Sequence, residues 1–315
     1  MNTNQTNKVA VLGTTSWGTT LAILLARNGI KVNLLARTES EAKALIDSGE
    51  NTRFTPGVTL PRSLIVTSSP KSAIENAQII VIAVPSNTIR ANIDRISSFI
   101  KPDAVLVSAT KGLEVKTGMR MTEVLVEELK NDWNGILCAL SGPNLAKEIL
   151  LGKPSTTVIA STSKREAKKI QDVFNSELFR VYTNDDIVGV ELGGALKNVF
   201  AIGAGICDGM KVGDNAKASF VTRGLAEMVR LTSVAGGNPL TIAGLAGVGD
   251  TIATCYSELS RNRTVGFKLA TGMKLDKILK SMDQVAEGVI TTAALVKLSN
   301  SLDVDMPITQ CTYEI

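Results

Sequence analysis

The sequence of 315 residues contains no histidine. Histidine has the ordinary pKa closest to neutral pH, which makes it the usual acid or base in enzyme sites. Its absence excludes Ser-His-Asp and Cys-His catalysis, and it excludes every metal site that needs an imidazole ligand. Any proton transfer must therefore rest on lysine, aspartate, glutamate, tyrosine, cysteine or water.

Cysteine is scarce as well. The four cysteines, Cys138, Cys207, Cys255 and Cys311, lie far apart and form no C-x-x-C pair. They stand in apolar or mixed stretches, as the free thiols of cytosolic proteins do. We expect neither a disulfide nor a metal site.

Long apolar runs and targeting signals are also missing. No apolar run is long enough to cross a bilayer, and the polar, uncharged residues 1–7 show no signal-peptide pattern. We therefore expect a cytoplasmic protein without stable membrane insertion.

The bulk composition indicates a globular chain with a large core. The length suggests two domains, and 44% hydrophobic against 20% charged residues is enough to fill their interiors. The net charge of +4 is mild and both signs are dispersed, so we expect no nucleic-acid partner. Local basic clusters can still bind a small anionic molecule.

The beginning of the chain predicts a βαβ unit. Residues 8–12 form an apolar, partly β-branched run, a polar turn and an apolar-periodic stretch follow, and residues 31–36 form a second strand. Gly13 and Gly18 fit the first and last positions of the dinucleotide motif G-x-G-x-x-G, but Thr15 occupies the middle one. The surrounding strands and helix favour a dinucleotide-binding turn over a turn that binds no nucleotide.

Arg37 closes the second strand at the position where an acidic residue would bind the 2′-hydroxyl of NAD. A guanidinium there suits the 2′-phosphate of NADP. A solvated arginine at the end of a strand is an equally good interpretation, and the sequence leaves both open.

Further strands alternate with helices as far as residue 183. The strands are expected at residues 64–67, 78–84, 104–110, 135–140, 156–160 and 178–182, with helices after Pro85 through Ile100 and at residues 164–174. Near-continuous apolar runs indicate parallel strands covered on both faces, so we predict a doubly wound Rossmann-type sheet. Its carboxyl edge would receive Lys111 and the segment 141–144, where ligands of such sheets bind.

After Asn184 helical periodicity takes over, from Ile187 to Leu302, with breaks at Gly213, Gly236 and Gly237, Gly249 and Gly272. We predict two domains: a Rossmann-type dinucleotide-binding domain over residues 1–184, and an all-helical domain over residues 185–315 that carries substrate binding and catalysis.

Lys197 stands out in that second part. Residues 191–199 predict the beginning of a helix, and the residues one turn away from Lys197 are Gly193 and Ala201. Apolar surroundings lower the pKa of a lysine toward the range useful for proton transfer. A lysine that reaches to the surface along its apolar stem is the competing interpretation.

Two further clusters follow. The glycine-rich residues 244–249 suggest a tight turn that presents the carboxylate of Asp250. Ser260, Arg261, Asn262 and Arg263 open an expected helix, where hydroxyl, guanidinium and amide donors beside a helix N-terminus suit a phosphate. Taken alone, the second cluster is explained slightly better by a capped and solvated helix start.

Together these segments resemble the bacterial-type NAD(P)-dependent glycerol-3-phosphate dehydrogenases. The resemblance runs from Lys8 to about Thr309, and eight short motifs in the family's order carry it: residues 16–18, 108–113, 140–143, 191–198, 213–217, 244–250, 260–263 and 287–289.

The resemblance implies a role for individual residues. Lys197 matches the family's general acid and base, and Lys111 matches a residue that contacts both cofactor and substrate. The positions that match substrate-binding residues are Gly142, Asn144, Asp250, Ser260, Arg261 and Asn262. The positions that match cofactor contacts are Ser16, Trp17, Arg37, Ala146, Arg261, Val285 and Glu287, in addition to Gly13 and Gly18 of the glycine-rich turn.

Three features depart from the family. Thr15 stands where glycine or alanine is usual, so we expect looser approach of the pyrophosphate. Asn144 stands where serine is usual. The chain ends at Ile315, where the family commonly continues through another helix, and we therefore expect a truncated helical domain.

The implied activity is the reversible reduction of dihydroxyacetone phosphate to sn-glycerol 3-phosphate with NADPH or NADH, in the supply of glycerophospholipid synthesis, by a homodimer. Another lysine-dependent dehydrogenase of the hydroxyacid or 6-phosphogluconate kind is an alternative enzyme. A dinucleotide-binding sensor without turnover is an alternative from another class, which Thr15 motivates and the joint presence of Lys197, Asp250 and Arg261 opposes.

Overall fold

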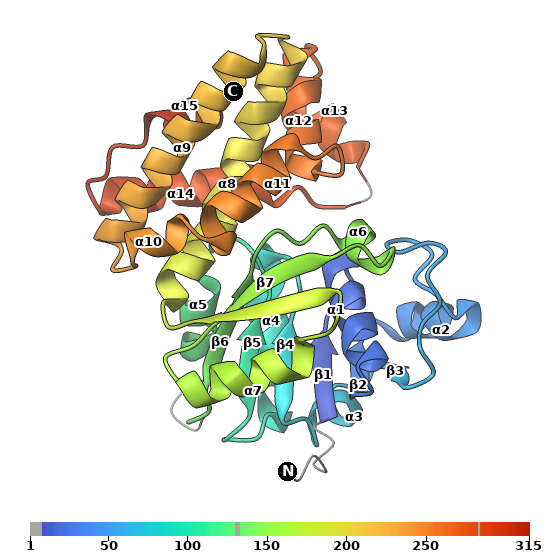
Figure 1. The fold of residues 1–315 in the computed structure, drawn as a ribbon. Coiled ribbons are helices and arrows are strands. Elements are labelled where there is room, and N and C mark those ends of the chain that lie inside the picture. Colours follow the sequence, from blue (N-terminus) through green and yellow to red (C-terminus); the bar gives the residue numbers. More distant parts are fainter. Residues whose placement is uncertain (1–7, 130–132, 283) are drawn as a thin grey trace.

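A computed structural model describes residues 8–129, 133–282 and 284–315. Figure 1 shows a sheet flanked by helices and a second, helical part that lies over one end of the sheet. Residues 1–7, on which the expectation about a signal peptide rests, lie outside the described residues.

The sheet has eight strands in the order β3-β2-β1-β4-β5-β6-β7-β8. The strands are β1 (Lys8–Leu12), β2 (Lys31–Leu35), β3 (Leu64–Thr67), β4 (Ile79–Ile82), β5 (Val105–Ser108), β6 (Leu137–Ser141), β7 (Ser155–Ala160) and β8 (Phe179–Asn184). The order reverses at β1, as in a doubly wound fold, and each strand end lies within two residues of the expected one. The predicted fold class is therefore confirmed.

Helices cover both faces of the sheet. One face carries α1 (Ser16–Arg27), α6 (Ala146–Leu150) and α7 (Lys164–Phe174), and the other carries α3 (Pro70–Ile74), α4 (Ile89–Asp94) and α5 (Met121–Leu129). α2 (Glu39–Ser48) follows β2 at the side of the sheet.

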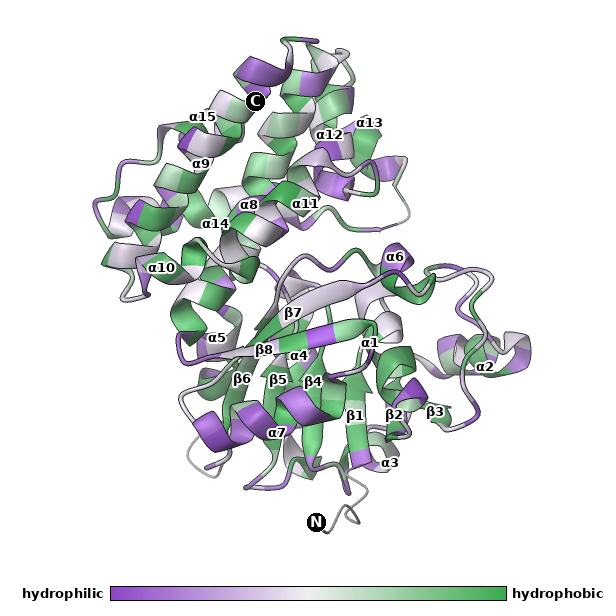
Figure 2. Cartoon of the chain, in the orientation of Figure 1, coloured by the Kyte–Doolittle hydropathy of each residue, from purple (hydrophilic) through white to green (hydrophobic). Residues whose placement is uncertain are grey.

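The core of the sheet follows from the alternation of side chains along each strand. In β1, Val9 and Val11 pack toward α1, whereas Ala10 and Leu12 pack toward α3 and α4. Figure 2 shows the result as hydrophobic central strands, beside helices such as α7 that are hydrophilic on their outer face. This double burial explains why the strands are near-continuous apolar runs in the sequence.

Two details of the sheet part differ from expectation. The single helix expected after Pro85 is broken into three short turns, η1 (Ser86–Thr88), α4 and η2 (Ser97–Phe99). β7 runs antiparallel to β6, and every other pair of neighbours is parallel. β7 and β8 consequently point away from the ligand-binding edge that β1, β4, β5 and β6 share.

The helical part is built around α8 (Ile187–Gly209), which is buried from Gly189 to Gly205. The helix begins at Ile187, where the helical periodicity is expected to begin and four residues before the start that residues 191–199 suggest, and the Asp186 carboxylate caps it by accepting from the Gly189 N–H at 2.8 Å. α8 is long and apolar enough to cross a membrane, but 89% of its most apolar window is buried inside the protein. It is the core helix of the second part.

Further helices surround α8. They are α9 (Asp214–Val234), α10 (Pro239–Ile242), α11 (Asp250–Tyr256), α12 (Arg261–Ala270), α13 (Leu275–Lys280), α14 (Glu287–Ser301) and α15 (Pro307–Glu314). Glycines on α8 and α12 permit close packing: a Cβ at Gly205 would lie 2.0 Å from the Arg263 carbonyl oxygen, and one at Gly266 would lie 1.8 Å from that of Ile202. No strand occurs in residues 185–282 or 284–315.

The glycine-rich approach to Asp250 is not a tight turn. Residues Leu245–Gly249 form a π-helical turn, η4, which continues directly into α11 with Asp250 as its first residue. Gly249 therefore does not break the helical path, and the expectation of a turn there was wrong.

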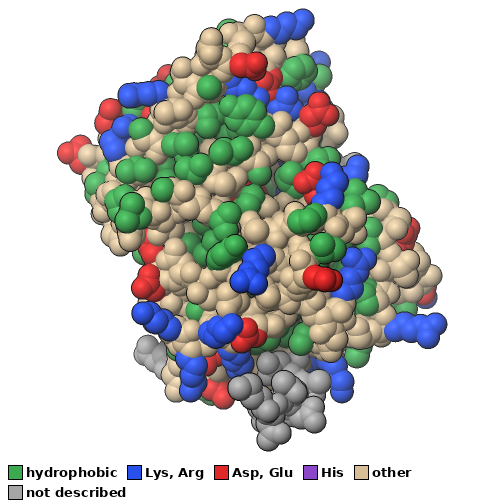
Figure 3. All heavy atoms as spheres, viewed as in Figure 1, with side chains coloured by type: hydrophobic (Ala, Val, Ile, Leu, Met, Phe, Trp, Pro, Cys, Tyr) green, Lys and Arg blue, Asp and Glu red, His purple; other side chains and the backbone are tan. Residues whose placement is uncertain are grey.

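The surface differs between the two parts. On the face drawn in Figure 3, hydrophobic side chains gather on the helical part, and charged side chains of both signs are scattered over both parts. Exposed apolar residues of the helical part include Met210, Ile252, Tyr256 and Phe267, each at least 45% exposed.

Candidate active site

A large cavity, of about 880 Å³, lies between the carboxyl edge of the sheet and the helical part. It brings together twelve of the residues singled out in the sequence: Gly13, Ser16, Trp17, Arg37, Lys111, Asn144, Ala146, Lys197, Arg261, Asn262, Val285 and Glu287. One cavity therefore joins the glycine-rich turn to the buried lysine of α8.

Four expected residues stand behind the cavity wall: Gly18, Gly142, Asp250 and Ser260. A Cβ at Gly18 would lie 2.0 Å from the Gly13 carbonyl oxygen, so Gly18 closes the turn. The Gly142 carbonyl accepts from Lys111 Nζ at 2.9 Å. Ser260 is buried and caps α12 by accepting from the Arg263 N–H at 3.3 Å.

The turn between β1 and α1 has the shape that a dinucleotide needs. Gly13 has a φ of +110°, and a Cβ there would lie 2.8 Å from the Ala83 carbonyl oxygen. The Thr15 hydroxyl donates to that same oxygen at 2.8 Å and accepts from the Gly18 N–H at 3.1 Å. Thr15 thus ties the turn to the chain just after β4 and caps α1, while the N-terminus of α1 faces the cavity through Ser16 and Trp17.

Around the end of β2 the cavity holds charges of both signs. Arg37 is exposed there, and its backbone N–H donates to Glu41 Oε2 at 2.9 Å. The Thr14 hydroxyl donates to Glu41 Oε1 at 2.7 Å. Arg95 reaches the same place and donates to the Ala36 carbonyl at 3.4 Å. Sequence reasoning missed both Glu41 and Arg95, because neither belongs to the glycine motif and only folding brings them to it.

At the other end of the cavity Asp250 joins two lysines. Its Oδ1 accepts from Lys197 Nζ at 2.6 Å, and its Oδ2 accepts from Lys111 Nζ at 2.7 Å. Lys197 Nζ also donates to Thr254 Oγ1 at 2.8 Å. Lys111 follows β5 in the sheet part, whereas Lys197 and Asp250 come from α8 and α11, so this centre combines both parts of the molecule.

Burial controls the proton affinity of Lys197. It lowers the pKa of that lysine from its ordinary value to about 8, and the neighbouring charge of Lys111 acts in the same direction. The carboxylate of Asp250 opposes both. An amine with this pKa holds a proton at neutral pH and releases it readily.

Hydrogen bonds between amide groups fix the cavity wall beside Lys197. Asn262 Nδ2 donates to Asn198 Oδ1 at 2.8 Å, and Asn262 Oδ1 accepts from the Gly288 N–H at 3.0 Å. These bonds connect α12 to α8 and to the first turn of α14, and they leave Asn262 a single amide hydrogen for a ligand.

Asn144 is held in a similar way. Its Nδ2 donates to the Thr156 carbonyl at 2.8 Å, and its Oδ1 accepts from the Thr157 hydroxyl at 2.9 Å. The side chain is bound to β7, so Asn144 also presents one remaining donor. Ala146 opens α6 beside it.

Glu287 connects the helical part to the sheet part. Its carboxylate accepts from the Ser86 hydroxyl at 2.6 Å and from the Ser86 N–H at 3.2 Å. Burial raises the pKa of Glu287, and the hydrogen bonds from Ser86 oppose that rise. Ser86, at the start of the turn after β4, carried no signal in the sequence.

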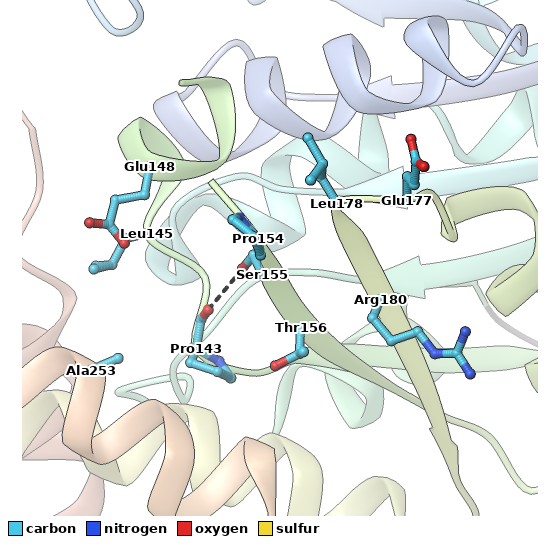
Figure 4. Close-up of a pocket in the computed structure, with 10 residues that line it drawn as sticks. All are labelled: Pro143, Leu145, Glu148, Pro154, Ser155, Thr156, Glu177, Leu178, Arg180 and Ala253. Carbon is cyan, nitrogen blue, oxygen red and sulfur yellow. Dashed lines mark hydrogen bonds between the residues drawn. The ribbon is translucent and has the colours of Figure 1, made fainter. Parts of the chain in front are cut away.

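A second cavity of about 350 Å³ lies on the other side of the segment that follows β6. Figure 4 shows Pro143, Ser155 and Leu178 in its wall, with the Ser155 hydroxyl donating to the Pro143 carbonyl at 3.2 Å. None of the residues singled out for catalysis or binding lines it. No group of three acidic, histidine or cysteine side chains able to hold a metal ion occurs within residues 8–129, 133–282 and 284–315.

The fold and the large cavity define a class of protein. A doubly wound sheet with a glycine-rich turn at the point where the strand order reverses, followed by a helical part that adds a buried lysine, is the architecture of the dinucleotide-binding dehydrogenases. Comparisons with known proteins narrow this class. Residues 8–167 match the N-terminal family of NAD-dependent glycerol-3-phosphate dehydrogenase, and residues 186–315 match its C-terminal family. The chain belongs to the NAD-dependent glycerol-3-phosphate dehydrogenase family.

Individual relatives agree with this assignment. A glycerol-3-phosphate dehydrogenase [NAD(P)+] of Chlorobium limicola is 48% identical over 307 residues, which is 98% of this chain and 92% of the relative. The structure of glycerol-3-phosphate dehydrogenase from Coxiella burnetii has a TM-score of 0.93 at 36% identity and covers 98% of this chain and 93% of that one. The enzyme from Saccharomyces cerevisiae has a TM-score of 0.84 at 25% identity, with 98% and 95% covered.

Proposed function

We propose that the protein is an NAD(P)-dependent glycerol-3-phosphate dehydrogenase, which reversibly reduces dihydroxyacetone phosphate to sn-glycerol 3-phosphate. Membership of the family supports this function. The observation that carries it is the pair of lysines held by one carboxylate, Lys111 and Lys197 on Asp250, at the end of a cavity that begins at a glycine-rich turn.

The residues around the turn fit a dinucleotide. Gly13, with its positive φ, lets the chain turn closely past Ala83, and Ser16 and Trp17 place the N-terminus of α1 at the cavity, which suits a pyrophosphate. The residues that would hold the cofactor are Gly13, Ser16, Trp17, Gly18, Arg37, Lys111, Ala146, Arg261, Val285 and Glu287. When bound, the nicotinamide supplies or accepts the hydride at C2 of the substrate.

Lys197 moves the proton. During reduction its ammonium donates to the oxygen on C2, and during oxidation its amine takes that proton back. A pKa of about 8 suits both directions near neutral pH. Asp250 fixes both ammonium groups, and Lys111 adds a second positive charge that stabilises negative charge on the same oxygen.

The N-terminus of α12 binds the substrate phosphate. Arg261 lines the cavity and supplies a guanidinium, Asn262 supplies its remaining amide hydrogen, and Ser260 fixes the helix start. Gly142 and Asn144 complete the substrate wall on the sheet side. Phosphate binding far from C2 orients the carbonyl toward Lys197.

On the scale of the chain, we propose that residues 1–184 form the cofactor-binding domain and residues 185–315 the substrate-binding and catalytic domain. We also propose a cytoplasmic homodimer that supplies glycerophospholipid synthesis. Exposed apolar side chains on the helical part, such as Tyr256 and Phe267, support a subunit interface there. Light scattering after gel filtration tests the dimer, and a monomeric mass overturns it.

The activity is tested with pure protein, dihydroxyacetone phosphate and either NADH or NADPH, by following the loss of nicotinamide absorbance. Saturable turnover is expected with at least one cofactor. Arg261→Ala should lose roughly 2–4 kcal/mol of transition-state binding with the phosphorylated substrate. Unphosphorylated dihydroxyacetone is the control, because it lacks the group that Arg261 binds. Equal losses on both substrates would remove Arg261 from the phosphate site.

A further inference from the structure

We infer that Glu41 sets how this protein divides its binding between NAD(H) and NADP(H). Its carboxylate accepts the ribose 2′-hydroxyl of NAD(H) and repels the 2′-phosphate of NADP(H). The inference rests on the proposed function, because it requires a dinucleotide in the large cavity. It adds a residue that opposes Arg37, the side chain expected to favour NADP(H).

The position of the carboxylate is fixed from two sides. Oε1 accepts from the Thr14 hydroxyl at 2.7 Å, and Oε2 accepts from the Arg37 backbone N–H at 2.9 Å. Thr14 lies in the glycine-rich turn and Arg37 lies just after β2. In doubly wound folds the ribose that carries the 2′ substituent lies between these two segments.

Glu41 remains available to a ligand in spite of these bonds. It lines the large cavity, its side chain is only partly buried, and each carboxylate oxygen has a second lone pair. The acidic residue that selects NAD in this fold ordinarily ends the second strand. Here that position is Arg37, and Glu41 brings a carboxylate to the same place from the first turn of α2.

Opposing positive charges line the same cavity. Arg95 reaches the carbonyl of Ala36, the residue before Arg37, and Arg53 lines the same cavity with its guanidinium 4.8 Å from the centre of the Phe54 ring. Guanidinium groups favour a phosphate, and a carboxylate disfavours one. The balance between these arginines and Glu41 therefore determines the preference, and removing the negative charge must move it toward NADP(H).

The test uses the Glu41→Gln variant of the full chain. Glutamine can keep both hydrogen bonds that fix this side chain, because its carbonyl can accept from the Arg37 N–H while its amide donates to the Thr14 hydroxyl oxygen. Glu39→Gln is the matched control: it removes the same charge from the same turn of α2, but Glu39 is exposed and does not line the cavity. Dissociation constants of NADP⁺, NAD⁺, 2′,5′-ADP and 5′-AMP are measured by calorimetry, without turnover.

We expect Glu41→Gln to shift the affinity ratio toward the 2′-phosphorylated ligand of each pair by about tenfold, the effect of one charge at a partly solvated site. Glu39→Gln should change the ratio by less than about twofold, because an exposed charge is largely screened. Glu41→Thr, which removes both the charge and the hydrogen bonds to Thr14 and Arg37, should move the ratio in the same direction as Glu41→Gln.

Three results would overturn the inference: an unchanged ratio in Glu41→Gln and Glu41→Thr, an equal loss of affinity for both ligands of each pair, or an equal shift in Glu39→Gln. The second of these would make Glu41 a purely structural clamp. A wild-type protein that binds none of the four ligands would instead refute the proposed function.

Discussion

At the scale of single residues, the lowered pKa and the hydrogen bonds of Lys197 depend on residues that lie far from it in the sequence. Its apolar helix and the lack of histidine were visible in the sequence, and they were sufficient to predict a lysine of lowered pKa. The bonds to Asp250 and Thr254 were not visible, because they depend on how η4 and α11 pack against α8. Glu41 was missed for the same reason: its carboxylate meets Thr14 only once α2 has folded back.

We predict that Lys197→Ala lowers kcat by at least the ~10²–10⁴ expected for a lost general acid. Lys197→Arg should fail as well, because a guanidinium does not release a proton near neutral pH. Cofactor affinity, measured by calorimetry, should change little. Lys217→Arg is the control, since Lys217 is a buried lysine bonded to Asp208 at 2.8 Å outside the large cavity. Near-native kcat in Lys197→Arg would assign the acid to another group, with Lys111 the first to test.

The direction of the pH dependence follows from the pKa of Lys197. Reduction requires its protonated form, so the rate should fall as pH rises through about 8, and oxidation requires the neutral amine, so its rate should rise over the same interval. Asp250→Asn removes the negative charge that raises this pKa, and the inflection should move to lower pH in both directions. An inflection that stays in place would mean that the measured pKa belongs to a different group.

At the scale of elements, the strands were predictable and some connections were not. The near-continuous apolar runs of β4 and β5 indicate directly that both faces of these strands are buried. The expected helix 164–174 coincides with α7. β7 runs antiparallel to its neighbour β6. The direction of a strand depends on its position in the sheet, and the local pattern of residues does not reveal it. The glycines before Asp250 predict a tight turn because glycines usually end helices, but they form a π-helical turn instead: Gly193 allows η4 to lie against α8, and Gly247 allows it to lie against Ile242 of α10.

Thr15 caps α1 and also fixes the glycine-rich turn that is expected to bind the cofactor. We predict that Thr15→Val lowers the free energy of unfolding by about 1–2 kcal/mol, because it removes the cap of α1. The bond to the Ala83 carbonyl is also lost, so the turn should loosen and cofactor affinity should fall. Chemical denaturation and calorimetry measure the two effects. Thr15→Ser retains the hydroxyl and should behave like the wild type, and a loss in Thr15→Ser without a loss in Thr15→Val would show that the methyl group matters instead.

At the scale of the whole molecule, the two parts are joined by side chains as well as by the chain. Glu191 on α8 accepts from Arg120 at 2.8 Å and from the N–H of Thr122 at 2.9 Å, at the start of α5. The Glu287 carboxylate accepts a hydrogen bond from the Ser86 hydroxyl, and the Asp250 carboxylate accepts one from Lys111 Nζ. The sequence indicated two parts from the change of periodicity after Asn184, but it contained no sign of which charged residues would meet across the junction.

We predict that Glu191→Ala destabilises the protein by about 3–5 kcal/mol, the usual cost of breaking a buried ion pair. Glu191→Gln should cost less, because it still accepts a hydrogen bond and removes a charge that burial disfavours. Thermal or urea unfolding measures both. A smaller loss in the alanine variant than in the glutamine variant would contradict this role of Glu191 at the junction.

The bond from Lys111 to Asp250 joins residues 139 positions apart in the chain. Ribosomes make proteins from the N-terminus, and domains fold as they emerge. The sheet part, which ends with β8 at Asn184, is complete before α11 has been synthesised, so Lys111 takes its place without its counter-charge. The lysine pair therefore forms only after α11 has left the ribosome. A nascent chain can fold its cofactor turn early, and it acquires the paired lysines only when the helical part has been synthesised as far as α11.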